Sequence, residues 1–289
     1  MKYSLGPLHY CWHKDEVTAF YDAVAQSTVE LVYLGEVVCS RRRELKFSDY
    51  LQIAHQLRDA GKQVVLSTLA LVEAKSELTE LKKIVDNGEF MVEANDMAVV
   101  QLAHEQRLPF VAGPEINQYN LQTLKLLQKM GMQRFVMPLE LSKDWLTKVL
   151  ADKSALGFEA EVTGFGYLPL AHSARCFTAR QQGLSKDDCN TACIAYPTGI
   201  EVLTQEHQSL LRLNGIQTQA AQCTDLQDYQ QDMREIGVDW YRILPVNLSS
   251  IDYAERLIAN QPARRPDSIS NGYWLGQAGM HHCASTGAD

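Results

Sequence analysis

The sequence predicts an α/β fold of the TIM-barrel type, (β/α)8, with a long cysteine-bearing insertion after the seventh strand. Three observations predict it: short apolar runs alternate with amphipathic runs up to about residue 165, the alternation stops between residues 164 and 225, and it then resumes. Such an alternation is typical of parallel strands joined by crossover helices.

Seven strands are predicted before the insertion, from short runs rich in β-branched, aromatic and other apolar residues. They span residues 2–5, 29–34, 64–66, 90–94, 110–112, 135–137 and 159–163. One more strand, at residues 240–244, completes the eight that a barrel of this type requires.

The runs between these strands have apolar residues at helical spacing. The first predicted helix, at 15–25, places Val17, Phe20, Tyr21 and Val24 on one face. Ser48 is predicted as the N-cap of the second helix and Ser142 as that of the sixth. The remaining helices are expected at 72–85, around 99–102, at 121–130, at 226–236 and at 251–258.

A doubly wound open sheet is the alternative architecture. It usually has fewer strands and a glycine-rich first turn, and this sequence has neither G-x-G-x-x-G nor a P-loop. We therefore expect one barrel-like domain over residues 1–260, including the insertion at 164–225, followed by an irregular tail over residues 261–289.

Composition narrows the possible functions. The chain has 289 residues, is 46% hydrophobic and 21% charged, and carries a formal charge of −8. An acidic chain of this kind is not expected to be a general nucleic-acid binder. No stretch approaches the roughly 18 apolar residues of a membrane span, and the N-terminus lacks a signal-peptide pattern. We expect a cytoplasmic protein, whose thiols stay reduced.

Four of the seven cysteines are predicted to share one site. Cys176, Cys189 and Cys193 follow the seventh strand, and Cys39 follows the second. Chemistry in these barrels lies at the C-terminal ends of the strands, so all four thiols should lie on one face. Cys11, which follows the first strand, is an alternative member of the set.

Soft thiolate ligands select iron–sulfur clusters, zinc or copper(I). The spacing Cys-x12-Cys-x3-Cys with a remote fourth cysteine matches neither the usual zinc-finger pairs nor the compact run of small ferredoxins. Spacing alone therefore leaves three interpretations open: an iron–sulfur cluster, a zinc site, or unconnected thiols.

Other residues could act near these cysteines. Guanidinium groups beside a cluster would stabilise its negative charge, or would bind an anionic substrate; otherwise they belong to solvated loops. Polar residues after strands one, two and five could face the barrel mouth. The guanidinium candidates are Arg41, Arg42, Arg43, Arg175 and Arg180. The polar candidates at the barrel mouth are His9, His13, Glu36, Glu115 and Asn117.

Two segments carry a family resemblance. Residues 167–178, together with residues 188–197, resemble the signature of the collagenase-like peptidase family U32, and residues 114–120 resemble another of its segments. The similarity extends from residue 1 to about residue 280. Other members carry a cysteine seven residues before the one that matches Cys176, whereas this chain has Pro169 there.

The resemblance implies a [4Fe–4S] cluster held by Cys39, Cys176, Cys189 and Cys193, with Cys39 in place of the missing cysteine. It also implies a role in oxygen-independent hydroxylation during ubiquinone biosynthesis, with prephenate as hydroxyl donor. The implied partners are a sister subunit, UbiU, in a heterodimer, and a lipid-binding accessory protein. The alternatives are a peptidase, an RNA-modification factor, or a purely structural cluster-bearing subunit. No catalytic residue is assigned.

Overall fold

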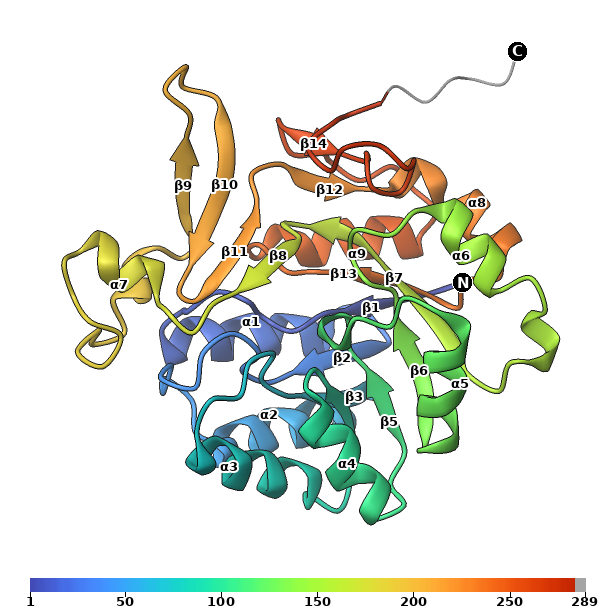
Figure 1. The fold of residues 1–289 in the computed structure, drawn as a ribbon, viewed down its shortest axis with the longest axis horizontal. Coiled ribbons are helices and arrows are strands. Elements are labelled where there is room, and N and C mark those ends of the chain that lie inside the picture. Colours follow the sequence, from blue (N-terminus) through green and yellow to red (C-terminus); the bar gives the residue numbers. More distant parts are fainter. Residues whose placement is uncertain (284–289) are drawn as a thin grey trace.

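The computed structural model describes residues 1–283, and within them eight parallel strands close into a barrel (Figure 1). The barrel strands are β1 (Lys2–Leu5), β2 (Leu31–Leu34), β3 (Gln63–Ser67), β4 (Met91–Ala94), β5 (Phe110–Ala112), β6 (Met132–Val136), β7 (Glu159–Gly166) and β13 (Trp240–Ile243). They neighbour one another in chain order, and pairing of β13 with both β1 and β7 closes the ring. The predicted fold class is confirmed.

A helix follows each strand in sequence, except that the insertion separates β7 from its helix. These helices are α1 (Lys14–Gln26), α2 (Phe47–Asp59), α3 (Lys75–Val85), α4 (Met97–Glu105), α5 (Leu121–Lys129), α6 (Lys143–Val149), α8 (Gln230–Ile236) and α9 (Ser249–Ile258). Helix α1 buries the apolar face that its periodicity predicts. None of the helices in residues 1–283 has both the length and the apolar character needed to cross a bilayer.

The predicted start of α2 is wrong. The helix begins at Phe47 with Lys46 as its N-cap, so Ser48 lies inside its first turn. The carboxylate of Asp49 accepts the backbone N–H of Lys46 at 2.7 Å, and this satisfies one of the groups that a helix start leaves unpaired. Helix α3 likewise begins at Lys75 rather than at residue 72, because Glu77 accepts the backbone N–H groups of Glu73 and Ala74.

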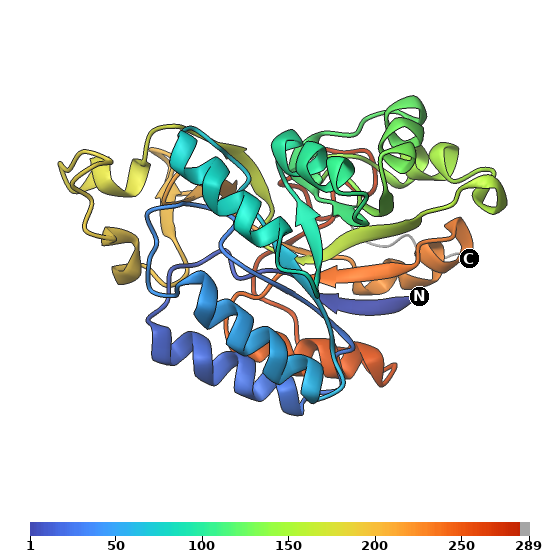
Figure 2. The same ribbon diagram turned by 90° about the horizontal axis from the view of Figure 1, so that it is seen from below.

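The insertion forms a second, antiparallel sheet of four strands in the order β8-β11-β10-β9. These strands are β8 (Pro169–His172), β9 (Ile200–Leu203), β10 (Ser209–Asn214) and β11 (Gln217–Ala220). One short helix, α7 (Phe177–Gln181), was not predicted, since five residues are too few to show helical periodicity. Figure 2 shows the insertion, in yellow and light orange, gathered at the end of the molecule opposite the N-terminus.

Two short strands extend the barrel sheet. Strand β12 (Cys223–Asp225) pairs antiparallel with the end of β7, and β14 (Ile269–Ser270) pairs with β12. The segment after residue 260 therefore returns to the barrel, where Trp274 is only 2% exposed.

Charged side chains fill the middle of the barrel. Arg242 on β13 donates to Glu93 on β4 at 2.7 Å and to Glu161 on β7 at 2.8 Å. The ring of Tyr33 on β2 lies against the same guanidinium, 3.9 Å from its central carbon. Alternate residues of a strand point to opposite faces, so these groups share the barrel interior while their neighbours pack outward against the helices.

Glu161 shows how this interior responds to pH. Burial by itself would raise the pKa of its carboxyl group, but the guanidinium groups of Arg242 and Arg134 outweigh burial and lower the pKa below its ordinary value of 4.5. A carboxyl group with a lowered folded-state pKa stabilises the fold above its unfolded pKa. That contribution is lost as the pH falls through the folded-state pKa.

We predict that Glu161→Gln lowers the free energy of unfolding by about 3 kcal/mol at pH 7, because it leaves a buried guanidinium only partly compensated. The difference from wild type should shrink as the pH falls below about 4.5, the ordinary value for Glu161. Urea unfolding at several pH values measures both effects. Asp252→Asn, which breaks the exposed pair with Arg256, should cost below about 1 kcal/mol. Equal losses for the two variants would contradict this account.

Candidate metal centre

The four predicted cysteines line one cavity at the C-terminal side of the barrel strands. Cys39 lies in the loop after β2, Cys176 caps α7, and Cys189 and Cys193 flank the start of η3 (Ala192–Ala195). Cys39, Cys176 and Cys193 are buried, and Cys189 is partly exposed. The structure therefore brings together thiols that are up to 154 positions apart (193 minus 39) in the sequence.

Ion pairs join the loops that carry these cysteines. Arg41, next to the Cys39 loop, pairs with Asp187, and Lys186 pairs with Glu73 at the start of the α3 region. Arg41 and Asp187 are largely exposed, so their pair contributes little stability by itself. The Arg41–Asp187 pair instead joins the two loops, so that Cys189 lies next to the loop that carries Cys39.

The backbone between Cys189 and Cys193 is strained. Asn190 and Thr191 have φ values of 44° and 55°, in the left-handed region that residues with a side chain seldom adopt. Two such residues in succession cost of the order of 1–3 kcal/mol each and persist only where their surroundings impose them. Here they turn the chain so that both flanking cysteines line the same cavity.

Arg42 is a buried cation on the wall of this cavity. Its guanidinium donates to the backbone oxygen of His9 at 2.6 Å and to Oδ1 of Asn214 at 2.7 Å, and it lies 3.6 Å from Glu36. Its Nε has no partner in the described chain. A buried positive charge beside four thiols favours an anionic occupant, as a thiolate-ligated cluster would be.

The thiols differ in acidity. Burial raises the pKa of Cys39 to about 11 and also raises that of Cys176. The neighbouring thiol of Cys11, followed by the charge of Arg42, lowers the pKa of Cys193 below its ordinary value. Cys11 is thus close to Cys193, yet it lines a neighbouring cavity with Glu36 and Tyr50 rather than the cavity of the four cysteines. Metal binding would have to displace the protons of Cys39 and Cys176.

The four thiols are spaced around the cavity rather than gathered at one point. In residues 1–283 no three His, Cys, Asp or Glu side chains are close enough together to hold one metal ion. A cubane separates its four thiolates further than one zinc ion does, so four thiols spaced around a cavity suit the larger group. The backbone N–H of Ala179 also donates to Sγ of Cys176 at 3.4 Å, a kind of contact that tunes cluster sulfurs.

The other predicted residues fall into four groups. Glu36 lies with Arg42, and Arg43 lines the groove between α2 and α3. His9 and Glu115 line a separate cavity at the barrel mouth. The remaining predicted residues, Arg175, Arg180, His13 and Asn117, are exposed and line neither the cysteine cavity nor the mouth cavity.

Sequence reasoning missed several polar residues at the mouth. Glu93, Asn95, Thr163 and Arg242 line that cavity together with His9 and Glu115. A signal was present for two of them: Glu93 and Arg242 are charged residues inside otherwise buried strands. A charge in such a strand is expensive unless it is paired, so it indicates a polar centre inside the fold.

A wide groove of about 620 Å³ separates α2 from α3. Its walls include Leu69, Leu81 and Ile84, and the loop of residues 40–47 brings Arg43 and Lys46 to it. Arg41 and Arg42 line both this groove and the cysteine cavity. A ligand in the groove would therefore lie beside the candidate metal centre.

Comparison with known proteins gives a match to a family model and to curated proteins. The model described as Peptidase family U32 matches residues 15–259. The tRNA hydroxylation protein P of Escherichia coli (strain K12) is 26% identical over 175 residues, which cover 57% of this chain and 38% of that protein. The chain thus aligns with well under half the length of this relative.

Two solved structures are similar to this chain at low scores. The tryptophan synthase complex of Pyrococcus furiosus has a TM-score of 0.45 at 11% identity, covering 89% of this chain and 95% of that chain. Dihydropteroate synthase of Xanthomonas albilineans has a TM-score of 0.44 at 11% identity, covering 91% and 94%.

We predict that Thr191→Pro disrupts the candidate metal centre, because proline fixes φ near −65° and cannot adopt the left-handed turn between Cys189 and Cys193. Metal bound per chain after anaerobic purification should fall roughly tenfold or more, as for the loss of other supporting contacts around a metal. Thr191→Gly is the matched control and should keep its metal, since glycine adopts this φ without strain. Full metal content in the proline variant would show that the turn does not position the ligands.

Proposed function

Because this chain belongs to peptidase family U32 and four of its cysteines line one cavity, we propose that it is a [4Fe–4S] subunit of the UbiV type. Its role would be oxygen-independent hydroxylation in ubiquinone biosynthesis. The observation that carries the proposal is the convergence of Cys39, Cys176, Cys189 and Cys193 on a cavity walled by a buried arginine. Similarity to a protein named for hydroxylation supports the reaction class.

Cys39, Cys176, Cys189 and Cys193 would hold the cluster. Bound there, it would supply electron transfer or brace the insertion, since four cysteine ligands leave no open iron position. The chain's own residues have two tasks. Arg42 compensates negative charge at the cavity wall, and the Arg41–Asp187 pair keeps the two cysteine-bearing loops together.

The groove between α2 and α3 supports a substrate with polar and apolar parts. The cationic loop that carries Arg41, Arg43 and Lys46 could bind the carboxylates of prephenate, the hydroxyl donor of this proposal. The apolar walls suit a ring with a hydrocarbon tail. The proposed partners are UbiU, as the sister subunit of a heterodimer, and a lipid-binding accessory protein that presents the tailed substrate.

RNA hydroxylation is a second candidate, and the similarity to tRNA hydroxylation protein P favours it. The charge of −8 opposes it, because RNA binding gains most of its affinity from cationic side chains on phosphates. Deletion of the gene separates the two candidates: loss of tRNA hydroxylation with unchanged anaerobic ubiquinone would favour the RNA role.

We predict that anaerobically purified protein holds about four iron and four sulfide per chain. Alanine at Cys39, Cys176, Cys189 or Cys193 should remove most of both, because the remaining three thiolates hold the cluster weakly. Iron and sulfide assays with a visible absorption spectrum measure this outcome.

Cys11→Ala and Cys283→Ala are matched controls, since neither thiol lines the cavity. Both variants should keep wild-type iron. Zinc in place of iron and sulfide would refute the cluster. Loss of iron in Cys11→Ala, with wild-type iron in Cys39→Ala, would show that Cys11 and not Cys39 is the fourth ligand.

Deletion of the gene should abolish most ubiquinone in cells grown without oxygen and leave the aerobic level unchanged. The wild-type gene should restore the anaerobic level, and the Cys176→Ala gene should not. Ubiquinone measured in lipid extracts decides the outcome. An unchanged anaerobic level in the deletion strain would refute the pathway, whatever the metal content.

A further inference from the structure

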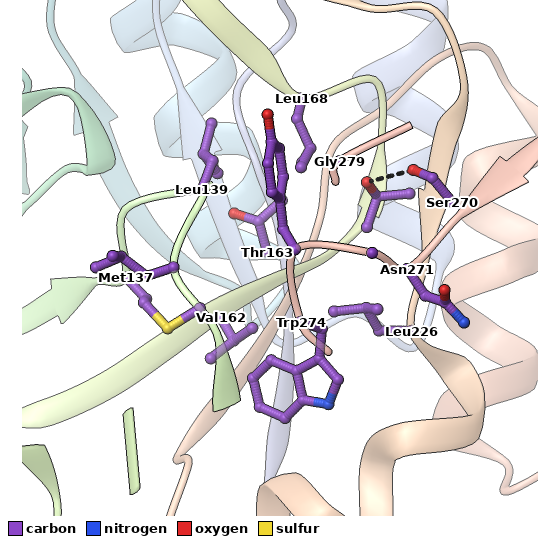
Figure 3. Close-up of a pocket in the computed structure, with 14 residues that line it drawn as sticks. Met137, Leu139, Val162, Thr163, Leu168, Leu226, Ser270, Asn271, Trp274 and Gly279 are labelled. Atoms are coloured by element: carbon purple, nitrogen blue, oxygen red, sulfur yellow. Dashed lines mark hydrogen bonds between the residues drawn. The ribbon is translucent and has the colours of Figure 1, made fainter. Parts of the chain in front are cut away.

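The groove between α2 and α3 has room for an organic ligand. The cavity at the barrel mouth and the one beneath the C-terminal segment each have room for about one water molecule. Figure 3 shows the second of these, where side chains such as Met137, Val162 and Trp274 surround the remaining space. The groove holds about 620 Å³, which lies within the range of pockets that bind small molecules.

This groove exists because two successive helices of the barrel are apart. Helix α2 packs against α1, and helix α3 packs against α4. Figure 2 shows α2, in light blue, beside α1, with α3, in cyan, apart from both. The space between α2 and α3 is lined by the loop of residues 40–47, by α3 and by the ends of β2 and β3. A ligand there would be enclosed by several segments of the chain.

Apolar side chains form much of the groove. Phe47, Tyr50 and Ile84 line it and are only half-buried, so part of each side chain is open to a ligand. Buried leucines lie behind them and also belong to the lining: Leu34, Leu45, Leu66, Leu69 and Leu81. A hydrocarbon chain in the groove would remove apolar surface from water, which favours binding.

The three carboxylates that line the groove are already bonded. Glu36 lies 3.6 Å from the guanidinium of Arg42. Glu80 pairs with Lys83 at 2.6 Å. Glu77 accepts two backbone N–H groups at the start of α3. These acids therefore have their own partners and do not neutralise the remaining cations of the groove.

Two cations of the groove stay available to a ligand. Arg43 and Lys46 are exposed and line the groove. In residues 1–283 neither of them forms an ion pair, whereas the neighbouring Arg41 and Arg42 both do. On a chain with a formal charge of −8, this is a local positive site. Charge complementarity favours an anion beside these two side chains.

We propose that the groove binds a single-chain anionic amphiphile, that is, a carboxylate joined to a hydrocarbon chain. The carboxylate pairs with Arg43 and Lys46, and the chain covers the open parts of Phe47, Tyr50 and Ile84. This assignment rests on the proposed function for the use of the groove as a substrate site, and it adds the class of ligand that the groove selects. A small dicarboxylate such as prephenate would use the two cations alone.

The ligand's carboxylate lies on the side of the groove that borders the candidate metal centre. The loop with Arg43 and Lys46 begins directly after Cys39. Arg41 and Arg42, from the same loop, line both the groove and the cysteine cavity. A ligand held by this loop is therefore close to the four cysteines without occupying their cavity.

A single molecule suits the groove better than a membrane surface does. Anionic lipids repel a chain that carries a formal charge of −8. The open apolar parts of Phe47, Tyr50 and Ile84 line a groove instead of protruding from the surface. A free hydrocarbon chain can enter such a groove, whereas the chains of a bilayer remain in their own layer.

Four probes test the class of ligand: hexanoate, octanoate, octan-1-ol and octylammonium. Saturation-transfer NMR titrations on the full chain, purified anaerobically, should show saturable binding of octanoate. Octanoate should bind about four- to fifteenfold more tightly than hexanoate, the gain expected for two methylenes that are partly or fully buried. Octan-1-ol and octylammonium lack the anion and should bind about fivefold more weakly than octanoate, or weaker still. Equal binding of hexanoate and octanoate, or tighter binding of octylammonium, would overturn the class.

Removal of both free cations tests the polar end. The double variant Arg43→Gln, Lys46→Gln should weaken octanoate binding about tenfold and leave octan-1-ol binding unchanged. The matched control is Lys75→Gln with Lys82→Gln, which changes the charge equally on α3 but outside the groove lining. The control should bind octanoate like wild type. Equal losses in the two double variants would show a general charge effect and would refute the site.

A bulky side chain in the lining tests the position of the hydrocarbon chain. Ser76→Trp, on the groove side of α3, should weaken both octanoate and octan-1-ol about fivefold or more. Thr79→Trp, on the same helix but outside the lining, should leave both unchanged. Unchanged binding in Ser76→Trp would place the chain elsewhere and would contradict the proposal.

Flotation with phosphatidylglycerol vesicles tests the membrane alternative. The wild-type protein should remain in the soluble fraction. Flotation of wild type that is lost in the Arg43→Gln, Lys46→Gln variant would show that the groove contacts a lipid surface, and the single-chain ligand would be wrong.

Iron measured on the same samples separates this inference from the proposed function. Octanoate binding by protein that holds no iron would refute the cluster and leave the groove standing. Full iron with no saturable binding of octanoate would refute the groove and leave the cluster standing.

Discussion

The ion pairs of Arg242 with Glu93 and Glu161 are the interaction on which the barrel interior depends. They join β4, β7 and β13 across the barrel, and the ring of Tyr33 on β2 lies against the same guanidinium. Removing three charges from water is costly, and a hydrophobic interior of equal volume could be as stable. The charged interior instead fixes the position of the Arg242 guanidinium, because two of its three nitrogens are already bonded to carboxylates.

The insertion lines two cavities at the C-terminal side of the barrel. It contributes three of the four cysteines at one cavity and places His172 and Gln217 over the mouth at the other. Its polar side chains continue inward through Asn214, which bonds both to Arg42 and to the backbone of His9. The cysteine cavity and the mouth cavity therefore share one hydrogen-bonded wall.

How much of the fold could be predicted depended on the length and periodicity of each element. Helix α1 shows three turns of apolar spacing and was predicted to within a residue at each end. The start of α2 was predicted wrongly. The carboxylate of Asp49, the third residue of the helix, accepts the backbone N–H of Lys46 and sets the boundary, whereas Ser48 does not cap the helix. The sheet of the insertion was missed, since strands such as β9 and β10 are partly exposed and carry no continuous apolar run.

The sequence by itself determined the alternation of strands and helices, hence the barrel, and the order of loops that places Cys39 and the three later cysteines on one face. Those features are local or follow from strand direction alone. Only the tertiary structure decided that Arg42 is the buried arginine while its neighbours are exposed, and that Asn95, Thr163 and Arg242 meet at the mouth. Contacts between residues so distant in the chain depend on how the barrel closes and how the insertion packs over it, which no local pattern records.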